Sequence, residues 1–581
     1  MKTINKYAIV CIAMMIFSGC DDFLTEKPAT SLFDTHIYAN DETAFGGLVA
    51  CYRQFAGGGY YGTNFPTHVQ ANSVFAATRI NLPGYATIGA DMREIVDAAR
   101  FQITNVNSSL ASMWSGVYSA LVTINNFIYA VENAGGISEA AKLKYIGEAR
   151  FLRAVCNFDI VRLWGEAPLK IAPLQSIEDG NLPKSPVNDF FTAILDDLEY
   201  AEANMPTKAE QPAGRPFNYA ATALKAKVYA QMATSQDMFT HNAAQSYPDP
   251  YTSADRAEFW RQSYLAAKKV YDDKPYELVP RYGDLWQCRS ENTVESIFEI
   301  QFNADINNNN WMSRLVPEFS TYTPKLATAN GADRIRPSKV MYEWHVERYY
   351  DRVSYHKDPR IDENYVVNQY LRGPEHGNPY STVRIYPSDN VQANERYPVL
   401  IKYADPECSV INRTNTNWIY YRYADLLLVL AEAANEIDDP DNLKFKVVNE
   451  VLARARNSTP VGDPPSEQPA DWDPSDARFD TMEGFRMQIF REYLCELPIE
   501  GHEWYNIRRR GRAEFKYWAE LFNAGVLQYQ RPDDIAAGFD WRLFAPTEDN
   551  HVRKSMRWPI PYSEIINNSS MTEADQNFGY N

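Results

Sequence analysis

Apolar residues recur at steps of three and four in several stretches of the chain, a spacing that places them on one face of an α-helix. In residues 141–164 the pattern stops at Gly165, with Pro168 beyond it, and both residues are typical signals for a helix end. Residues 186–205 show the same spacing between two prolines. These two segments are predicted to form a helix pair. Three further pairs are predicted, namely 219–233 with 259–271, 420–437 with 443–455, and 42–54 with 110–131.

Helix pairs with small and aromatic residues at their crossings resemble tetratricopeptide units, which cannot bury their apolar faces alone and therefore stack. We expect a mainly α-helical fold in which the pairs form a curved layer, although their spacing is too irregular for a simple tandem array. Alternation of apolar and polar residues indicates a short strand at 295–302, and 398–403 is a second strand candidate.

Long segments between the helix pairs lack helical periodicity. Loops of this length in a compact protein are usually functional, so we expect the ligand-facing surface there. The predicted organisation is a signal peptide over residues 1–19 and one domain over 20–581. The helical scaffold of that domain covers about 40–56, 106–275 and 415–581, and its loop-rich, ligand-facing parts cover about 57–105 and 280–410.

The N-terminal segment has the layout of a bacterial lipoprotein signal. Lys2 and Lys6 precede an apolar run over residues 7–17 that is too short to span a bilayer, and small residues then lead to Cys20. We expect cleavage before Cys20 and lipid on that cysteine, which would anchor the protein at a membrane surface. An ordinary signal peptide with a chance cysteine is the alternative.

Composition narrows the class of partner. The formal net charge is −18, which argues against nucleic acid and other polyanions. Besides Cys11 in the signal and Cys20, five cysteines stand at irregular spacing, and we interpret them as buried apolar side chains rather than a disulfide framework. Aromatic residues make up 13% of the chain and tyrosine is the commonest of them, which suits stacking on sugar rings.

Several motifs follow one another in order along the chain. The first is the helix signature Gly147-Glu148-Ala149-Arg150, which continues through 151–154 to 168–169, and the others cover 421–433, 449–456, 496–509, 558–561 and 576–580. Together these motifs resemble the SusD/RagB family of surface lipoproteins from Bacteroidota, over essentially the whole mature chain.

The resemblance implies a lipid-anchored protein on the exterior of the outer membrane. It implies that the protein binds oligosaccharide or polysaccharide without chemistry and delivers it to a partner SusC-like TonB-dependent transporter. Capture of peptides, as by RagB-like relatives, is the alternative within the family. From other classes, a lipid-anchored glycoside hydrolase and a purely structural helical-repeat scaffold remain open.

Glu492, Glu496 and Glu500 form a carboxylate ladder, and a hydrolase would depend on such a cluster because glycoside hydrolysis uses two carboxyl groups. The nearby arginines are Arg491, Arg508, Arg509 and Arg510. Since neighbouring arginines keep glutamates ionised, we interpret the ladder as an ion-pair network. His502 has no second histidine at metal-ligand spacing, and no phosphate loop or nucleophile elbow occurs, so neither a metal nor a cofactor is predicted.

Candidate ligand residues rest on their position in the aperiodic loops, because the family's binding residues vary. Aromatic faces flanked by amides and carboxylates can stack on a pyranose and hydrogen-bond its hydroxyls. In 57–105 the candidates are Tyr60, Tyr61, Asn64, Phe65, Asn72, Arg79 and Tyr85, and in 280–410 they are Asn303, Asp305, Asn309, Trp311 and Tyr322. Four tryptophans of the framework motifs are predicted to be core, namely Trp114, Trp164, Trp504 and Trp558.

Overall fold

The computed structural model is mainly α-helical, as predicted, with a few short strands. It describes residues 38–73, 75–78, 90–174, 176, 178–242, 247–286, 291–303, 315, 334–366, 368–370, 382–384, 398–405, 414–439, 443–529 and 546–580. None of the described helices combines the length and the apolar character needed to cross a bilayer.

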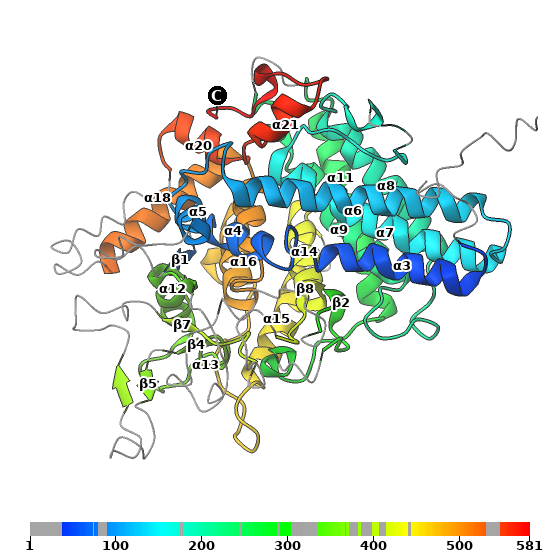
Figure 1. Cartoon of the computed structure of the whole chain (residues 1–581). Coiled ribbons are helices and arrows are strands. Elements are labelled where there is room, and N and C mark those ends of the chain that lie inside the picture. Colours follow the sequence, from blue (N-terminus) through cyan, green and yellow to red (C-terminus); the bar gives the residue numbers. More distant parts are fainter. Residues whose placement is uncertain are drawn as a thin grey trace, which may run out of the picture.

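All four predicted helix pairs are confirmed. The pairs are α3 (Asp41–Phe55) with α6 (Ser108–Asn133), α7 (Glu139–Trp164) with α8 (Val187–Asn204), α9 (Asn218–Ala233) with α11 (Ser253–Asp273), and α14 (Tyr423–Glu436) with α15 (Leu443–Arg456). Figure 1 shows α3, α6 and α7 lying alongside one another, in blue to cyan. Helix α14 begins three residues later than its predicted start at residue 420, because the residues before it form a strand that is hydrogen-bonded to 296–300.

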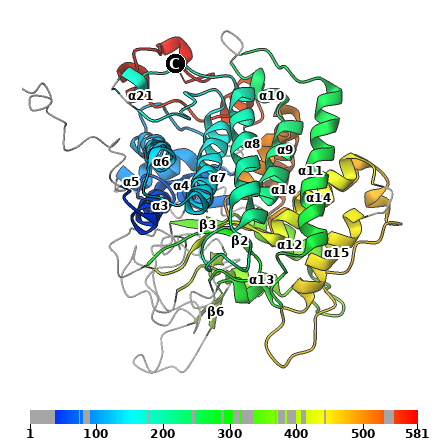
Figure 2. The same cartoon turned by 90° about the vertical axis from the view of Figure 1, so that its right-hand side faces the viewer.

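The pairs stack on one another in sequence order, because α6 packs on α7, α8 on α9, and α11 on α14. Figure 2, turned by 90°, shows this succession as one layer from α3 to α15. Almost all the buried apolar side chains belong to a single hydrophobic cluster that runs through the layer. The four framework tryptophans are at most 5% exposed, so their prediction as core residues is confirmed.

Local sequence signals explain where the long helices begin and end. Asn107 and Ser138 each accept a hydrogen bond from a first-turn amide of α6 and α7, which satisfies one N–H that the helix itself cannot. Thr252 forms a capping box with Asp255 at the start of α11. Gly165 ends α7 at a φ of 74°, a conformation that glycine adopts without steric cost.

The C-terminal third adds helices across the end of the layer. They are α16 (Met482–Glu496), α17 (His502–Arg509), α18 (Arg512–Tyr529), α20 (Asp549–Ser555) and α21 (Tyr562–Asn567). Earlier in the chain, the short helix α10 (Gln236–Phe239) follows α9. Helix α16 packs on α14, and α18 packs on both α17 and α20. In Figure 1 the last helices, α20 and α21, lie at the top in red.

The strands among the described residues form four two-stranded antiparallel ribbons. They are β1 (Ala76–Thr78) with β3 (Ile335–Pro337), β2 (Ser296–Ile300) with β8 (Trp418–Arg422), β4 (Tyr365–Val366) with β7 (Val399–Leu400), and β5 (Asn368–Tyr370) with β6 (Thr382–Arg384). The strand predicted at 295–302 is confirmed as β2, and the candidate at 398–403 contains the shorter β7.

Sequence periodicity missed four helices in the segments predicted to be loops. They are α4 (Asn64–Ala71), α5 (Ala90–Ala99), α12 (Lys339–Tyr349) and α13 (Arg360–Asn364). In α4 seven of the eight residues are buried, and they include the polar Thr67, His68 and Gln70, so polar positions in this short helix do not mark a solvent-facing side. The first part of 57–105, predicted to be loop-rich and ligand-facing, instead contains α4 and is mostly buried.

Candidate functional site

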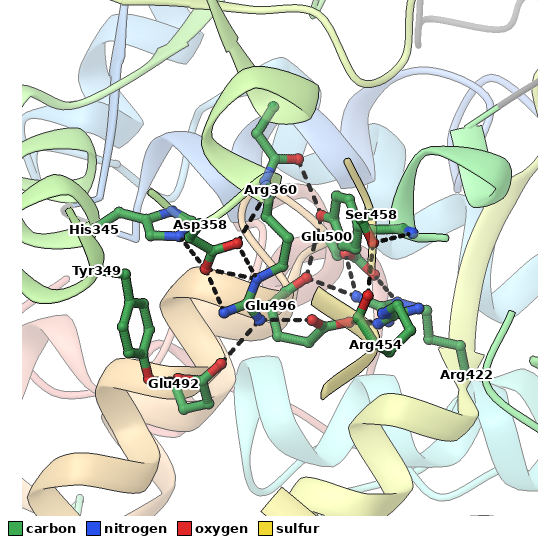
Figure 3. A network of polar contacts seen from close by, with 12 residues as sticks. His345, Tyr349, Asp358, Arg360, Arg422, Arg454, Ser458, Glu492, Glu496 and Glu500 are labelled. Carbon is green, nitrogen blue, oxygen red and sulfur yellow. Dashed lines mark hydrogen bonds and ion pairs between the residues drawn. The ribbon is translucent and has the colours of Figure 1, made fainter. Parts of the chain in front are cut away.

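A buried network of ion pairs joins the loop-rich part of the chain to the helical layer. Figure 3 shows Glu496, at the C-terminal end of α16, among three guanidinium groups. Its carboxylate lies 2.7 Å from Arg360 and 2.6 Å from Arg422, and it also pairs with Arg454. These side chains have almost no surface accessible to solvent.

Two more carboxylates extend the network around Arg360. Asp358 accepts from the Arg360 guanidinium at 2.6 Å and lies 2.9 Å from the His345 ring. Glu492 lies 2.9 Å from Arg360 and accepts a hydrogen bond from the Tyr349 hydroxyl. The guanidinium of Arg360, on α13, therefore binds carboxylates of α16 and of the loop just before α13.

On its other side the network reaches β2 and β8. Glu295 pairs with Arg422 at 2.7 Å and with Arg454 at 2.9 Å. Glu500 pairs with Arg422 at 2.9 Å and with the Lys402 ammonium at 2.8 Å. Most of these buried charges thus have two or more partners of opposite sign, the arrangement that makes a buried ion network tolerable.

The network keeps its glutamates ionised. Burial alone would raise the pKa of Glu496, but the three arginines outweigh it and lower that pKa to about 2. The pKa of Glu500 is lowered in the same way by Arg422 and Lys402. A general acid must hold a proton at the working pH, so neither carboxyl group is suited to protonate a leaving group.

The ion-pair interpretation of the glutamate ladder is confirmed, but the arginines expected as its partners are wrong. Arg508 donates to Asn72 and to backbone carbonyls, while Arg509 and Arg510 pair with Glu432 on α14. The guanidinium of Arg491 lies over the Trp344 ring. The true partners come from elements distant in sequence.

Four of the predicted ligand residues are buried and leave almost no surface for a ligand to contact. Tyr60 is 0%, Tyr61 3%, Phe65 4% and Asn72 3% exposed. The hollow that Tyr61 and Phe65 help to line holds ≈ 20 Å³, which is room for about one water molecule rather than a sugar.

Polar partners inside the core explain this burial. The hydroxyls of Tyr60 and Tyr61 donate to the same Asp159 oxygen at 2.5 and 2.8 Å, and Arg162 pairs with the other oxygen. A tyrosine can be buried at little cost when its hydroxyl is hydrogen-bonded. These rings therefore help to position α7 rather than a ligand.

Asn72 ties the end of α4 to the C-terminal helices. Its side-chain oxygen accepts hydrogen bonds from the indole N–H groups of Trp504 at 2.7 Å and Trp558 at 3.3 Å, and from Arg508 at 2.9 Å. Its amide group donates to the carbonyl of Ala98 at 2.7 Å. Both the oxygen and the nitrogen of its side-chain amide are therefore hydrogen-bonded within the protein.

The remaining predicted ligand residues are not brought together by the described part of the chain. Asn64 is half-buried at the start of α4, and Asn303 is exposed just after β2. Six others lie outside the described residues, namely Arg79, Tyr85, Asp305, Asn309, Trp311 and Tyr322, as does Cys20. Of the other cysteines, Cys51, Cys156 and Cys495 are buried free thiols, as predicted for them, while Cys288 and Cys408 lie outside the described residues.

Tyr355 is an exposed ring that the sequence reading missed. It is 75% accessible, more than any other aromatic side chain among the described residues, and its φ of 62° is unusual for a residue other than glycine. Asp351 holds the turn, since its carboxylate accepts from the amide of Val353 at 2.8 Å and from the hydroxyl of Ser354 at 2.7 Å. The only signal in the sequence is an apolar pair, Val353 and Tyr355, within a polar stretch.

Two larger hollows lie in the described part of the chain. One of ≈ 230 Å³ lies between residues 208–217 and β2, and one of ≈ 400 Å³ lies between the C-terminal end of α9 and the start of α18. Among the described residues no three histidine, cysteine, aspartate or glutamate side chains are placed to hold a metal ion together.

Comparison with known families identifies the fold. The model of the SusD family matches residues 294–580, and a model described as starch-binding and associating with the outer membrane matches residues 81–230. The chain belongs to the SusD-like family, which confirms the resemblance drawn from the sequence motifs.

Relatives match over nearly the whole chain. SusD-like protein P25 of Formosa agariphila is 22% identical over 98% of this chain and 99% of its own length. A SusD homologue from Bacteroides thetaiotaomicron superposes with a TM-score of 0.73, at 20% identity, over 95% of this chain and 99% of that one.

Two further solved structures are named for a glycan. A laminarin-binding SusD-like protein superposes with a TM-score of 0.62 at 19% identity, over 94% of this chain and 100% of that one. A structure with xylogluco-oligosaccharide superposes with a TM-score of 0.64 at 19% identity, over 90% and 98%. At these identities the likeness establishes the fold.

Proposed function

We propose that this protein binds oligosaccharide or polysaccharide at the outer membrane and delivers it to a partner SusC-like TonB-dependent transporter. The observation that carries the proposal is membership of the SusD-like family, with matches in both halves of the chain. The fold that it shares with a laminarin-binding protein and with a structure holding xylogluco-oligosaccharide supports a glycan as the ligand.

Lipid on Cys20 would hold the protein at the exterior face of the outer membrane. The lysines and the short apolar run before Cys20 support this anchor, and the family description that names the outer membrane supports the location. A membrane-tethered protein that binds a polymer raises the local concentration of that polymer beside the transporter, and binding would thereby assist uptake.

The proposed activity is binding without chemistry. The carboxylate cluster around Glu496 is buried, ionised and paired with arginines. It therefore has neither a protonated carboxyl group to act as an acid nor a surface that a substrate can reach. Reducing-sugar release from a bound glycan that Glu500→Gln abolishes in a folded protein would favour the hydrolase instead.

Tyr355 is the aromatic ring that we propose for ligand contact within the described residues. Its ring is exposed on a hydrogen-bonded turn, so little side-chain or backbone ordering is left for binding to impose. Trp311, Tyr322, Tyr85, Arg79, Asp305 and Asn309 stay as proposed ligand residues from the aperiodic segments, with Asn64 and Asn303 beside them.

Calorimetric titration of the soluble protein that begins after Cys20 tests ligand capture. The titrants are laminarin, xyloglucan and starch oligosaccharides and a pool of peptides, and we expect binding to at least one glycan. Binding to peptides alone would indicate that the protein captures peptides, as the RagB-like alternative predicts. Delivery is tested by gentle detergent extraction of native membranes, in which a SusC-like barrel should copurify with the protein.

A further inference from the structure

Two loops that lie far apart in the sequence meet beside the exposed ring of Tyr355. One is the turn over residues 351–357, between α12 and α13, and the other covers residues 459–468, after α15. The hydroxyl of Ser466 joins them, because it donates a hydrogen bond of 2.8 Å to the carbonyl of Lys357. In Figure 1 the second loop is drawn in gold at the foot of the molecule, near α13.

The side chains of His356 and Glu467 lie where these two loops touch. The backbone amide of Glu467 donates to Nδ1 of His356 at 3.5 Å, and a carboxylate oxygen of Glu467 lies 3.9 Å from Nε2 of the same ring. The Glu467 side chain is 72% exposed. No donor among the described residues hydrogen-bonds to its carboxylate, so the lone pairs of both oxygens are free to accept from a ligand.

Both loops are held in place before any ligand binds. In the first, the amide of Asp351 donates to the carbonyl of His356 at 2.8 Å. In the second, the amide of Ser466 donates to the carbonyl of Arg456 at 3.0 Å, and the Arg456 guanidinium donates to the carbonyl of Pro469 at 2.6 Å. A surface that is ordered in advance loses little conformational freedom when a ligand binds.

An exposed aromatic ring beside an open carboxylate suits a sugar. The ring of Tyr355 can stack on the C–H face of a pyranose, and Glu467 can accept hydrogen bonds from its hydroxyls. The exposed large apolar side chains on the two loops are Val353, Tyr355 and Val461. A stable protein partner usually covers about 800 Å² on each side around an apolar centre, so three scattered side chains favour a sugar as the ligand.

The surface carries more negative than positive charge. Of the two cations on these loops, Lys357 pairs with Asp362 at 2.7 Å, and Arg352 has no carboxylate partner among the described residues. Three carboxylates of the loops have neither a lysine nor an arginine partner among those residues, namely Asp351, Asp463 and Glu467. Acidic groups on a ligand would therefore be repelled here.

We propose that Tyr355, His356 and Glu467 form a sugar-contacting surface across the two loops, and that this surface takes uncharged glycan in preference to acidic polysaccharide. The inference rests on the proposed function for the choice of sugar as the ligand. It adds two contact residues and a charge class that family membership does not supply. The sequence does not signal the pair, because His356 and Glu467 lie 111 positions apart.

Calorimetric titration of the soluble protein that begins after Cys20 tests the charge class. The probes are laminarin and xyloglucan oligosaccharides as uncharged glycans and oligogalacturonate as the acidic one. We expect the parent protein to bind at least one uncharged glycan about tenfold or more tightly than oligogalacturonate at low ionic strength. The difference should shrink at high salt, because salt screens exposed charges.

Two substitutions at Glu467 test the contact itself. Glu467→Ala should weaken binding of the uncharged glycan by about 2- to 12-fold, which corresponds to the loss of one hydrogen bond. Glu467→Gln keeps an acceptor oxygen, so it should bind the uncharged glycan like the parent and bind oligogalacturonate more tightly than the parent does. Both variants should melt like the parent, since the side chain is 72% exposed.

Glu258→Ala is the matched control. Glu258 is also an exposed carboxylate, but it pairs with Arg261 on α11, so its removal should leave both affinities unchanged. An effect of Glu258→Ala equal to that of Glu467→Ala would show that overall charge, rather than the two-loop surface, governs binding.

The outcomes separate this inference from the proposed function. Unchanged affinity for the uncharged glycan in Glu467→Ala would remove Glu467 from the ligand surface, and oligogalacturonate bound as tightly as the uncharged glycans at low salt would overturn the charge class. In both cases glycan binding by the parent would still support the proposed function. If the parent binds none of the glycans, the proposed function and this inference fail together. Loss of a copurifying protein in Glu467→Ala, with glycan binding unchanged, would assign the surface to a protein partner instead.

Discussion

The guanidinium of Arg360 donates a hydrogen bond of 2.7 Å to the carboxylate of Glu496, and neither side chain has any surface exposed to solvent. The two residues lie 136 positions apart, one on α13 in the loop-rich part and the other on α16. This buried contact fixes the loop-rich part on the helical layer, and its value to stability can be measured directly.

We expect Arg360→Met to lower the free energy of unfolding by about 3 to 5 kcal/mol, because it leaves buried carboxylates without their partner. Urea denaturation followed by circular dichroism measures the change. Arg261→Met is the matched control, since Arg261 pairs with Glu258 on the exposed face of α11 and should leave the midpoint unchanged. Equal effects of the two substitutions would contradict a special role for the buried pair.

Glu496→Gln should make the protein less sensitive to acid. The pKa of Glu496 lies at about 2 in the folded protein, below its ordinary value of 4.5, so its ionised form contributes stability above pH 4.5. That contribution, on the order of 3 kcal/mol, is lost as the pH falls from about 4.5 towards 2. The stability gap between parent and variant, measured by urea denaturation, should therefore be widest at pH 7 and narrow below pH 4.5.

Glu503→Gln should show the opposite dependence on pH. Burial raises the pKa of Glu503 to about 7, so the folded protein favours the neutral carboxyl group and loses stability as the pH rises from 4.5 through 7. Glutamine stays neutral and keeps an oxygen for the Ile499 amide. We expect the variant to gain stability over the parent between pH 5 and pH 8, and a gap that does not change with pH would contradict the shift.

The helical layer could be predicted from the sequence because each long helix keeps a periodic apolar pattern or clear end signals. Helix α4 could not, since it is buried on all sides. The burial of Tyr60 and Tyr61 could not be predicted either, because their partner Asp159 lies nearly one hundred residues away. The glutamate ladder could be recognised as an ion network, yet its arginines sit at positions 360, 422 and 454, on three other elements. The sequence therefore identified the glutamates and tyrosines of these contacts, but it could not identify their partners, which are distant in sequence.

If the proposed lipid on Cys20 is the membrane anchor, Cys20→Ala should abolish metabolic labelling with a radioactive or clickable fatty acid. The apolar run over residues 7–17 is too short to span a bilayer, so the variant should leave the membrane fraction or be mislocalised. Cys156→Ala is a suitable control, because Cys156 is a buried thiol of the core. Unchanged labelling in Cys20→Ala would show that the lipid, if any, is attached elsewhere.

Removing an exposed aromatic ring should weaken glycan binding without lowering stability, whereas removing a buried ring should lower stability. Tyr355→Ala should weaken glycan binding by about 0.5 to 1.5 kcal/mol, the worth of one aromatic contact, with no change in melting temperature because the ring is 75% exposed. Trp311→Ala should behave in the same way if its ring also contacts the ligand. Trp164→Ala should instead lower stability by about 3 to 5 kcal/mol, since its indole is 1% exposed and donates to the Pro559 carbonyl at 3.1 Å. Calorimetric titration beside thermal melting measures both quantities on each variant. Normal binding by Tyr355→Ala, in a protein whose parent binds the glycan, would remove Tyr355 from the ligand surface.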